Sequence, residues 1–342
     1  MEKKRLFGRT LGELSDIVKA SSLPPYAGKQ IAGWLYRRGA PEISGMTDLS
    51  LATRRLLENE FETGLTPPVS VAAGSDGTKK YLFNVSGNRF VETAFIPDRE
   101  RATVCLSVQS GCRMGCRFCM TARQGFQGNL TSNEILNQFR SIPEHDSLTN
   151  IVFMGMGEPL DNLDEVLRTL DILTSEWGFG WSPTRITVST IGITGKIEEF
   201  LERSRCHLAV SLHSPFDAER QSLMPAQKAH PVREVLDTIR EFDFGRQRRV
   251  SFEYIVFKGL NDTPAHVREL ARILNGIRCR INLIRFHDIP GSEFRSPGQS
   301  EMEAFRDSLN AKGILTTIRA SRGQDINAAC GLLSTLEQNK NI

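Results

Sequence analysis

Three cysteines stand close together between residues 111 and 126, in the segment GCRMGCRFCMTARQGF. Their spacing, C-x₃-C-x₂-C, places Cys112, Cys116 and Cys119 in one short loop. Thiolates are ligands for zinc and for iron–sulfur clusters. Three thiolates suit a 4Fe–4S cluster, because they leave one iron without a protein ligand. That iron can bind a substrate or a cofactor.

A structural zinc site is the alternative interpretation of this loop. Zinc in such a site normally has four protein ligands, arranged as regular pairs. The sequence offers no second pair, since Cys206 and Cys279 are isolated and precede predicted strands. We expect these two cysteines to be buried apolar residues.

Other polar residues stand at the ends of predicted strands. They are Glu158, which follows Gly157 in FMGMGEPL, Ser189 in STIGI, Ser211 and His213 in AVSLHSP, and His287 after the sixth strand. Functional residues of a parallel β/α barrel gather at the carboxyl ends of its strands. The sequence therefore predicts a single site that combines these residues with the cysteine loop.

Strand-like and helix-like segments alternate from about residue 101 onward. The predicted strands cover 103–109, 150–157, 185–190, 207–213, 249–257 and 280–286, with a final run at 314–320. Several of them are short and continuously apolar, as in parallel sheets that are buried on both faces. Six β/α units are too few for a closed eight-stranded barrel. We predict an α/β fold built on a partial parallel (β/α)6 barrel with an open side.

Helix-terminal signals support the alternation. Thr131 with Glu134, and Ser300 with Glu303, have the spacing of a capping box. Pro264 is placed to occupy the first turn of a helix. Each signal predicts a helix that begins between two of the strands.

The chain divides by pattern into four segments. Residues 1–65 have helical apolar spacing and predict a small accessory domain, and residues 66–100 predict a β-hairpin linker. Residues 101–320 hold the predicted barrel, and residues 321–342 form a C-terminal loop and tail.

The composition is that of an ordinary globular protein. The 342 residues carry a net charge of only +3, so any face that binds nucleic acid must be local. Residues 1–60 contain 10 Lys and Arg against 7 Asp and Glu, an excess equal to the net charge of the chain. We find no signal peptide and no apolar run of about 18 residues, and expect a cytoplasmic protein with reduced thiols.

The cysteine loop, with Phe118 before its last cysteine, resembles the radical S-adenosylmethionine (SAM) superfamily. A narrower resemblance runs from about residue 5 to residue 335. Its motifs are RATVCLSVQSGCRMGCRFCMTARQGF, FMGMGEPL, STIGI, AVSLHSP and IRASRGQDINAACG. Together they resemble the adenosine-methylating RNA methyltransferases, which make 2-methyladenosine in 23S rRNA and in tRNA. A sister branch methylates C8 of the same rRNA adenosine and gives antibiotic resistance.

The resemblance implies a role for each matching residue. The three loop cysteines would hold the cluster, Gly157 and Glu158 would contact the methionine part of SAM, and Ser189 and residues 211–213 would line the rest of the cofactor pocket. Cys330 would be the methyl carrier, Cys105 the second redox-active cysteine, and Glu92 the proposed proton acceptor. The family usually has asparagine where this chain has His287, so the role of that position is open.

The implied chemistry explains why the family needs these residues. Adenine C2 is not a nucleophile, so direct transfer of a methyl group from the sulfonium of SAM does not work. The resemblance implies that Cys330 is methylated by displacement, and that a radical made from a second SAM activates this methyl group. The activated carbon joins to C2, a base removes the C2 proton, and a second thiol releases the product by forming a disulfide with Cys330.

Several of these residues also have ordinary structural interpretations. Cys105 and Glu92 are both candidates for the base, and the sequence does not choose between them. Taken alone, Cys105 is better explained as a core residue. Glu92 could be an ordinary solvated residue of an edge strand. His213 is as well explained by a buried, hydrogen-bonded histidine as by a ligand.

An RNA substrate requires a local basic face and an accessible base. Candidates for phosphate contacts are Lys29, Arg37 and Arg38 in the N-terminal helices, Arg246, Arg248 and Arg249 beside the fifth strand, and Arg319 and Arg322 near Cys330. Each of them, taken singly, is better explained as a solvated surface charge. The family resemblance further implies a flavodoxin-type electron donor, and we expect a monomer.

Two rival functions remain open at this stage. The first is the C8-methylating sister activity, against which GMGEPL and the RAT before Val104 favour C2. The second is a non-catalytic, zinc-stabilised RNA-binding protein, which needs a fourth metal ligand that the sequence does not offer.

Overall fold

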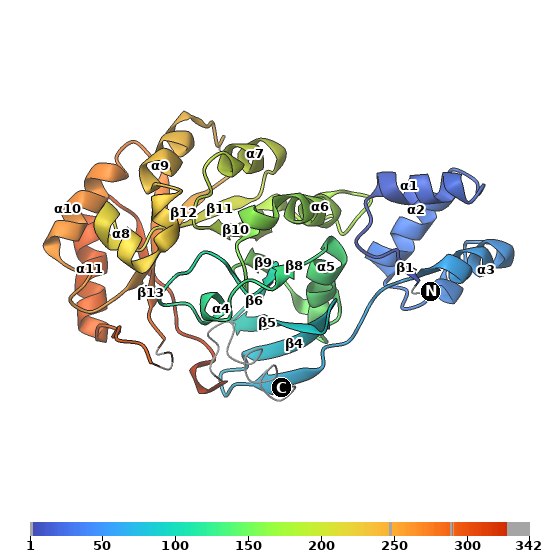
Figure 1. The fold of residues 1–342 in the computed structure, drawn as a ribbon, viewed down its shortest axis with the longest axis horizontal. Helices are drawn as coiled ribbons and strands as arrows, with labels where there is room; N and C mark the ends of the chain where they lie inside the picture. Colours follow the sequence, from blue (N-terminus) through green and yellow to red (C-terminus); the bar gives the residue numbers. More distant parts are fainter. Residues whose placement is uncertain (1–2, 246–247, 288, 290, 327–342) are drawn as a thin grey trace.

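The computed structural model describes residues 3–245, 248–287, 289 and 291–326. A ten-stranded sheet forms its centre, in the order β14-β13-β12-β11-β10-β9-β6-β5-β4-β3 (Figure 1). The strands are β3 (Ser70–Ala73), β4 (Lys79–Val85), β5 (Arg89–Asp98), β6 (Arg101–Cys105), β9 (Asn150–Phe153), β10 (Ile186–Thr190), β11 (His207–Ser211), β12 (Val250–Val256), β13 (Cys279–Arg285) and β14 (Thr316–Ile318).

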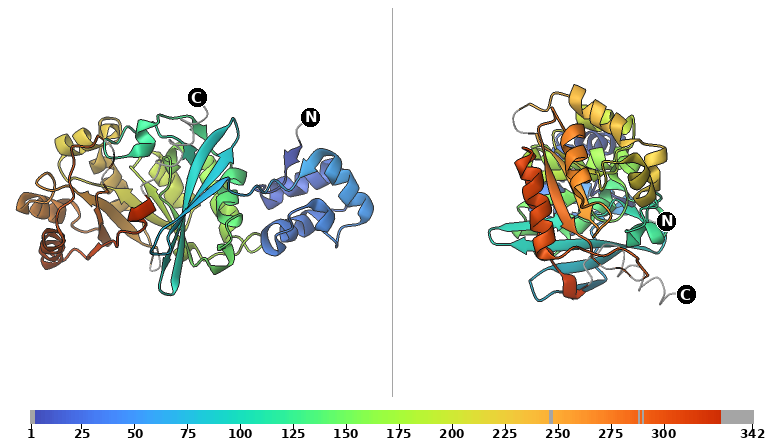
Figure 2. Two further views of the ribbon diagram at one scale, coloured as in Figure 1. Left: turned by 90° about the horizontal axis from the view of Figure 1, so that it is seen from below. Right: turned by 90° about the vertical axis from the view of Figure 1, so that its left-hand side faces the viewer.

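The seven strands β6 and β9 to β14 pair in parallel, and the curved sheet that they form leaves the barrel open (Figures 1 and 2). Helices cover its outer face: α5 (Ser132–Arg140), α6 (Leu163–Thr174), α7 (Lys196–Arg203), α8 (Asp217–Leu223), α9 (Val232–Glu241), α10 (Pro264–Ile273) and α11 (Gln299–Ala311). The predicted partial parallel barrel is therefore confirmed. Strand β14 is short and completes the parallel part after the six β/α units.

Two of the three helix-start predictions are confirmed. The Thr131 hydroxyl accepts from the Glu134 amide, and the Glu134 carboxylate accepts from the Thr131 amide, so a capping box opens α5. Pro264 occupies the first position of α10. The Ser300–Glu303 signal correctly predicts a helix between β13 and β14 but not its cap, because α11 begins at Gln299 after the N-cap residue Gly298, whose amide donates to the Glu301 carboxylate.

The predicted hairpin forms from β4 and β5, and β3 adds a third strand to it. Strand β5 also pairs with β6 in antiparallel register, opposing Ala94 to Cys105. The hairpin therefore extends the barrel sheet itself and carries it across the open side (Figure 2). A sequence pattern identifies a hairpin but not the third strand with which it pairs, because that contact is non-local.

The N-terminal residues form a separate lobe at one end of the molecule (Figure 1). It contains β1 (Lys4–Arg5), α1 (Leu11–Ala20), α2 (Ala27–Ala32), a π-helical turn over Gly33–Arg38, α3 (Leu51–Glu60) and β2 (Phe61–Glu62). Strands β1 and β2 pair with each other in parallel and close the lobe.

Aromatic packing joins this lobe to the barrel. Tyr36 lies 5.9 Å from Trp177 and 5.4 Å from Phe179, measured between ring centroids. The Asn133 side-chain amide of α5 donates to the Phe7 and Gly64 carbonyls of the lobe, at 3.0 Å each. The lobe is thus packed on α5 and the segment after α6.

No helix in the described ranges is long and apolar enough to cross a membrane.

Candidate functional site

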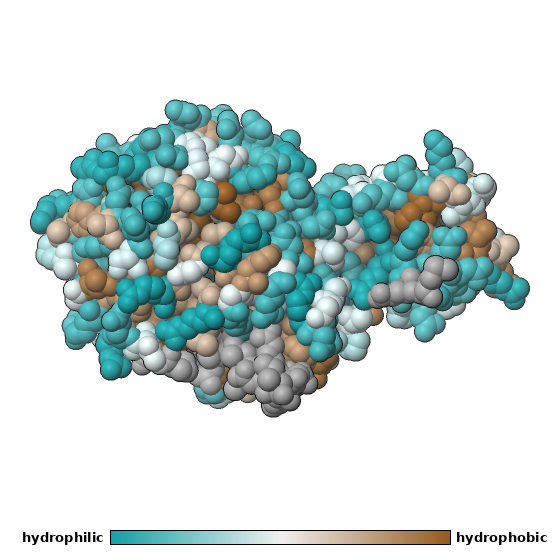
Figure 3. Space-filling model, viewed as in Figure 1, coloured by the Kyte–Doolittle hydropathy of each residue, from teal (hydrophilic) through white to brown (hydrophobic). Residues whose placement is uncertain are grey.

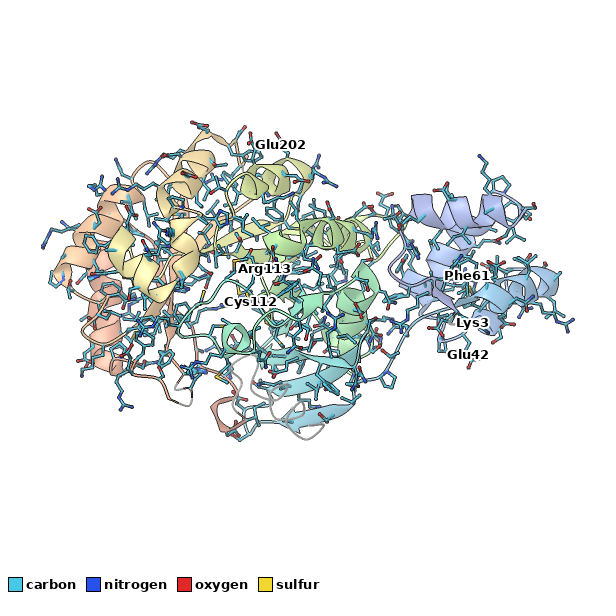
Figure 4. All side chains as sticks on the ribbon, in the orientation of Figure 1. Lys3, Glu42, Phe61, Cys112, Arg113 and Glu202 are labelled. Carbon is cyan, nitrogen blue, oxygen red and sulfur yellow. The ribbon has the colours of Figure 1, made fainter. Side chains whose placement is uncertain are left out.

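The cysteine loop rises from a small antiparallel ladder in which β7 (Gln109–Ser110) pairs with β8 (Gly128–Asn129). Gly111 follows β7 with φ +69°, and a Cβ there would collide with the Gly125 carbonyl oxygen. The loop can therefore close on itself only with glycine at this position. Figure 4 labels Cys112 on this loop. Cys112 and Cys116 are buried, and Cys119, just before the short helix α4 (Met120–Arg123), is half-buried.

Apolar residues surround the loop cysteines. Cys116 packs in a cluster with Ile191, Leu223, Met224, Phe257, Phe286 and Ile289. Burial raises the pKa of Cys112 to about 12, with a hydrogen bond from the Met114 amide acting in the opposite direction. Burial likewise raises the pKa of Cys116. Thiols in such surroundings ionise only when a metal centre takes their electron pairs. Three sulfur ligands in one apolar loop fit an iron–sulfur cluster.

Glu158 lies where β9 leads into a 3₁₀ turn (Pro159–Asn162), beside the end of β10. Its carboxylate accepts from the Thr190 hydroxyl at 2.6 Å, the Ile191 amide at 2.9 Å and the Leu160 amide at 3.0 Å. The side chain is only 3% exposed. Burial raises the pKa of Glu158 to about 7, and these three hydrogen bonds act against the rise. The carboxylate is thus rigidly held at the carboxyl ends of two adjacent strands.

Gly157 has φ +96°, and a Cβ there would lie 2.5 Å from Cβ of Gln109. The Gln109 side chain accepts from the Glu158 amide at 2.9 Å and donates to Asp161 and Asn129. Glycine at position 157 therefore lets the chain pass close to β7 and turn Glu158 toward β10.

His213 follows β11 in a left-handed conformation, with φ +56°. Its Nδ1 accepts from the Ile255 amide at 3.0 Å, and its ring meets that of Phe118 edge-on at 4.9 Å. Burial lowers the pKa of His213 to about 3, and the nearby Arg220 charge acts in the same direction. The imidazole is therefore neutral and carries its proton on Nε2. Both interpretations of His213 have support, since it is buried and hydrogen-bonded yet touches the cysteine loop.

The remaining predicted cofactor-pocket residues stand at the same end of the barrel. Ser189 is the fourth residue of β10 and Ser211 the last of β11; both are half-buried. Leu212 is fully buried. His287, just after β13, lines a cavity of about 470 Å³ in the barrel interior. The structure thus brings the predicted residues to one end of the sheet, with His287 on the wall of the cavity.

Cys105 lies on the wall of the same cavity, with Ala94, Thr103 and Met154. It is 8% exposed, so it is nearly buried but faces a space and not a filled core. Cys105 therefore faces this cavity, and its redox role stays a prediction. No disulfide is found among the described residues. The expected partner of Cys105, Cys330, lies outside them, so their bond stays a prediction.

Glu92 is not the solvated edge residue that a surface interpretation requires. It lies on β5, two residues before Ala94, and is 2% exposed. Its carboxylate is 2.9 Å from the ammonium of Lys80 on β4, which is 1% exposed. Alternation along β5 puts Glu92 on the same face of the sheet as Ala94, which lines the cavity. Glu92 and Cys105 therefore share the interior face of the sheet.

Arginines surround the cavity: Arg101, Arg285, Arg319 and Arg322 line it. Arg319 also lies 3.4 Å from the Glu253 carboxylate, and Arg322 lies 2.6 Å from Asp98. Arg248 is not available to RNA, since its guanidinium donates to the Cys206 and Leu201 carbonyls. Arg249 is exposed, and Arg246 lies outside the described residues.

Three residues that position this site were missed by sequence reasoning. They are Gln109, which orients the Glu158 loop, Thr190, which holds the Glu158 carboxylate, and Arg220, which is completely buried beneath the cysteine loop. Thr190 adjoins the predicted Ser189, but alternation alone points the two side chains to opposite faces. Nothing in a single sequence distinguishes Arg220 from a surface arginine of an amphipathic helix.

The chain is similar to known proteins both in sequence and in structure. Residues 106–272 match the radical SAM superfamily. A crystal structure of a radical SAM methyltransferase from Sphaerobacter thermophilus superposes with a TM-score of 0.89 at 39% identity, covering 96% of this chain and 98% of that one.

Curated relatives match over the full length. Probable dual-specificity RNA methyltransferases RlmN from Parabacteroides distasonis and Bacteroides fragilis are 58% and 54% identical; the alignments cover 98% and 100% of this chain and the same shares of those proteins. The dual-specificity RNA methyltransferase RlmN of Syntrophus aciditrophicus is 42% identical over 98% of this chain and 97% of its own. Identity at this level over whole chains shows the family: this chain belongs to the RlmN dual-specificity RNA methyltransferases of the radical SAM superfamily.

Proposed function

We propose that this protein methylates C2 of adenosine in 23S rRNA, at the peptidyl transferase centre, and in tRNA, next to the anticodon. The observation that carries the proposal is the match to dual-specificity RNA methyltransferases over nearly the whole chain. The cavity supports the proposal, because Cys105 lines this cavity and Glu92 lies on the same face of the sheet as Cys105. The enzyme is SAM-dependent.

The protein uses a 4Fe–4S cluster and SAM, as the radical SAM family does. When bound, the cluster supplies the electron that splits SAM into a radical. Cys112, Cys116 and Cys119 would hold the cluster in their apolar loop. Glu158 and Gly157 would position the methionine part of SAM, while Ser189, residues 211–213 and His287 would line the rest of its pocket.

Three residues would handle the methyl group and the proton. Cys330 would carry the methyl group on its sulfur, and Cys105 would attack that sulfur to release the product. Either Glu92 or Cys105 would take the C2 proton. The Lys80–Glu92 pair favours Glu92, because the contact keeps a carboxylate on the interior face of the sheet.

RNA would bind through basic residues of both lobes. Lys29, Arg37 and Arg38 are exposed on the N-terminal lobe, although Arg38 also pairs with Asp48 at 3.0 Å. Arg319 and Arg322 line the cavity and would contact the phosphates of an extruded nucleotide. Deleting the N-terminal lobe is a poor test of this role, because it would uncover the aromatic packing around Trp177 and Phe179. Replacing Lys29 and Arg37 by glutamine tests the same role in an intact fold.

Figure 3 shows that the face in view is mainly hydrophilic, with apolar patches on both lobes.

We propose that the enzyme works as a cytoplasmic monomer with a flavodoxin-type electron donor. The electron donor is proposed from the family resemblance and from the need for a one-electron reduction.

Nucleoside analysis tests the proposed function directly. Anaerobically reconstituted protein is incubated with SAM, a one-electron reductant, and unmethylated rRNA or tRNA, and the digested RNA is compared with 2-methyladenosine and 8-methyladenosine standards by mass spectrometry. We expect 2-methyladenosine from both RNAs. Formation of 8-methyladenosine alone would assign the chain to the C8 branch instead.

A further inference from the structure

Arg220 is the largest completely buried side chain in the described part of the molecule. It lies on α8, and its guanidinium donates to three backbone carbonyls: Ile191 at 2.8 Å, Ser211 at 3.0 Å and Leu212 at 3.1 Å. A fourth bond goes to the side-chain oxygen of Gln227. These acceptors are neutral, so they satisfy the donors of Arg220 without balancing its charge.

Within the described ranges, no carboxylate oxygen lies within 4.0 Å of the Arg220 guanidinium. The charge of Asp217 acts on Arg220 from a greater distance, and a hydrogen-bond link runs through Gln227, whose amide nitrogen donates to Asp217 at 3.0 Å. Asp217 is itself 48% exposed and lies 3.4 Å from Arg233. A buried cation without a close counter-charge is costly, and folded proteins seldom keep one without a partner.

The cysteine loop lies directly against α8, as Figure 1 also shows. The Arg117 amide donates to the Leu223 carbonyl at the end of α8, at 3.0 Å, and Cys116 packs on Leu223 and Met224. Ile191, whose carbonyl accepts from the Arg220 guanidinium, belongs to the same apolar cluster as Cys116. The buried cation and the candidate cluster ligands are therefore spatial neighbours.

We propose that Arg220 is the buried counter-charge of the iron–sulfur cluster and makes its reduction easier. The inference rests on the proposed cluster ligands Cys112, Cys116 and Cys119. A four-iron cluster with three thiolates carries net negative charge, and an electron accepted from a one-electron donor increases that charge. A fixed cation in a medium of low polarity stabilises the more negative state. Arg220 is in this sense a positioning residue, since it acts through the cluster and not on the substrate.

A purely structural role is the competing explanation. Arg220 ties the end of β10 to the end of β11, and the loss of that tie alone would lower stability without changing the cluster. Arg248 provides a matched control for this effect. Its guanidinium also donates to two backbone carbonyls, those of Cys206 at 2.9 Å and Leu201 at 2.7 Å. Cys206 precedes β11, so Arg248 is at the opposite end of the strands from the cysteine loop.

The experiment compares wild type, Arg220→Gln, Arg220→Lys and Arg248→Gln after anaerobic reconstitution with iron and sulfide. Dithionite titration followed by electron paramagnetic resonance gives the equilibrium for one-electron reduction. We expect Arg220→Gln to shift this equilibrium at least about tenfold toward the oxidised cluster, which corresponds to about 59 mV for one electron. Arg220→Lys should retain most of the wild-type equilibrium, because it retains the charge. Arg248→Gln should retain it fully.

Gln227→Glu asks the same question if Arg220→Gln does not fold. It places a carboxylate against the guanidinium and leaves the three carbonyl bonds in place, so the same direction of shift is expected. If reconstituted Arg220→Gln has the same reduction equilibrium as the wild type, the inference is overturned and the cluster assignment stays intact. If Arg220→Gln does not fold, the same result for Gln227→Glu has the same meaning. Failure of the wild-type protein to take up a cluster would instead defeat the proposed function.

Discussion

The Lys80 ammonium lies 2.9 Å from a Glu92 carboxylate oxygen, and both side chains are at most 2% exposed. The two residues stand on neighbouring antiparallel strands, in diagonal positions of the β4–β5 register. A buried ion pair of this kind adds little net stability over an apolar pair. The pair lies on the face of the sheet that also carries Cys105.

Breaking this pair should be costly. We expect Lys80→Met to lower the free energy of unfolding by about 3–5 kcal/mol, because it leaves a buried carboxylate without its cation. The double variant Lys80→Met/Glu92→Gln should lose clearly less stability than the single variants Lys80→Met and Glu92→Gln lose together. Urea denaturation of the cluster-free proteins gives the free energy of unfolding of all three variants. Arg203→Met, which breaks an exposed pair with Glu199 on α7, is the control and should change little. Strictly additive losses would show that the two buried charges do not depend on each other.

Cys105 is expected to act after the new carbon–carbon bond has formed. Cys105→Ser should assemble its cluster but accumulate a covalent RNA–protein adduct, because a serine hydroxyl cannot form the disulfide that releases the product. Labelled RNA on a denaturing gel detects the adduct. Cys206→Ser is a suitable control, since Cys206 is 1% exposed and precedes β11 at the other end of the strands. An adduct in both variants, or in neither, would contradict this role.

Cys330→Ala should behave differently from Cys105→Ser. Without the carrier thiol neither methylated nucleoside nor adduct should form, because no carbon is attached to the enzyme. Iron content and the cluster absorption near 400 nm should match wild type. Methylation by Cys330→Ala at any rate comparable with wild type would show that the methyl group takes another route.

Much of this architecture was predictable from local patterns. The strands, the cysteine loop and the residues at the strand ends follow from short apolar runs and motif spacing. Other features depend on contacts between distant segments. The antiparallel pairing of β5 with β6 brings Glu92 and Cys105 to one face, and the burial of Arg220 depends on the carbonyls of Ile191, just after β10, and Ser211, the last residue of β11. Because each partner is remote in sequence, no local pattern reveals either relationship.

Glu158 predicts a measurable pH dependence. Its pKa in the folded protein, about 7, is above the ordinary value of 4.5, so the folded state holds the proton more tightly than the unfolded chain. The resulting stabilisation is complete below pH 4.5 and is lost as the pH rises through 7. At about 1.4 kcal/mol per pKa unit, the change across this window is roughly 3 kcal/mol.

Comparing wild type with Glu158→Gln isolates that contribution. Unfolding free energies of the cluster-free proteins are measured between pH 5 and pH 8, and the difference between the two is plotted against pH. We expect wild type to lose stability relative to the variant as the pH rises. A difference that stays constant over this range would show that Glu158 titrates normally in the folded protein.

Gly157 is expected to tolerate no side chain. An added Cβ would stand 2.5 Å from Cβ of Gln109, at a φ of +96°, so Gly157→Ala must move either β7 or the Glu158 turn. Strain and overpacking together should cost about 2–5 kcal/mol. SAM affinity, measured by calorimetry on the reconstituted protein, should fall because the Gln109 side chain no longer holds the Glu158 amide.

Gly180→Ala is the control that separates backbone strain from overpacking. Gly180 has a similar φ of +68° but no atom within 4 Å of its added Cβ, so only the backbone strain, about 1 kcal/mol, applies there. Equal losses in the two variants would mean that the close approach of Gly157 to Gln109 does not shape the site.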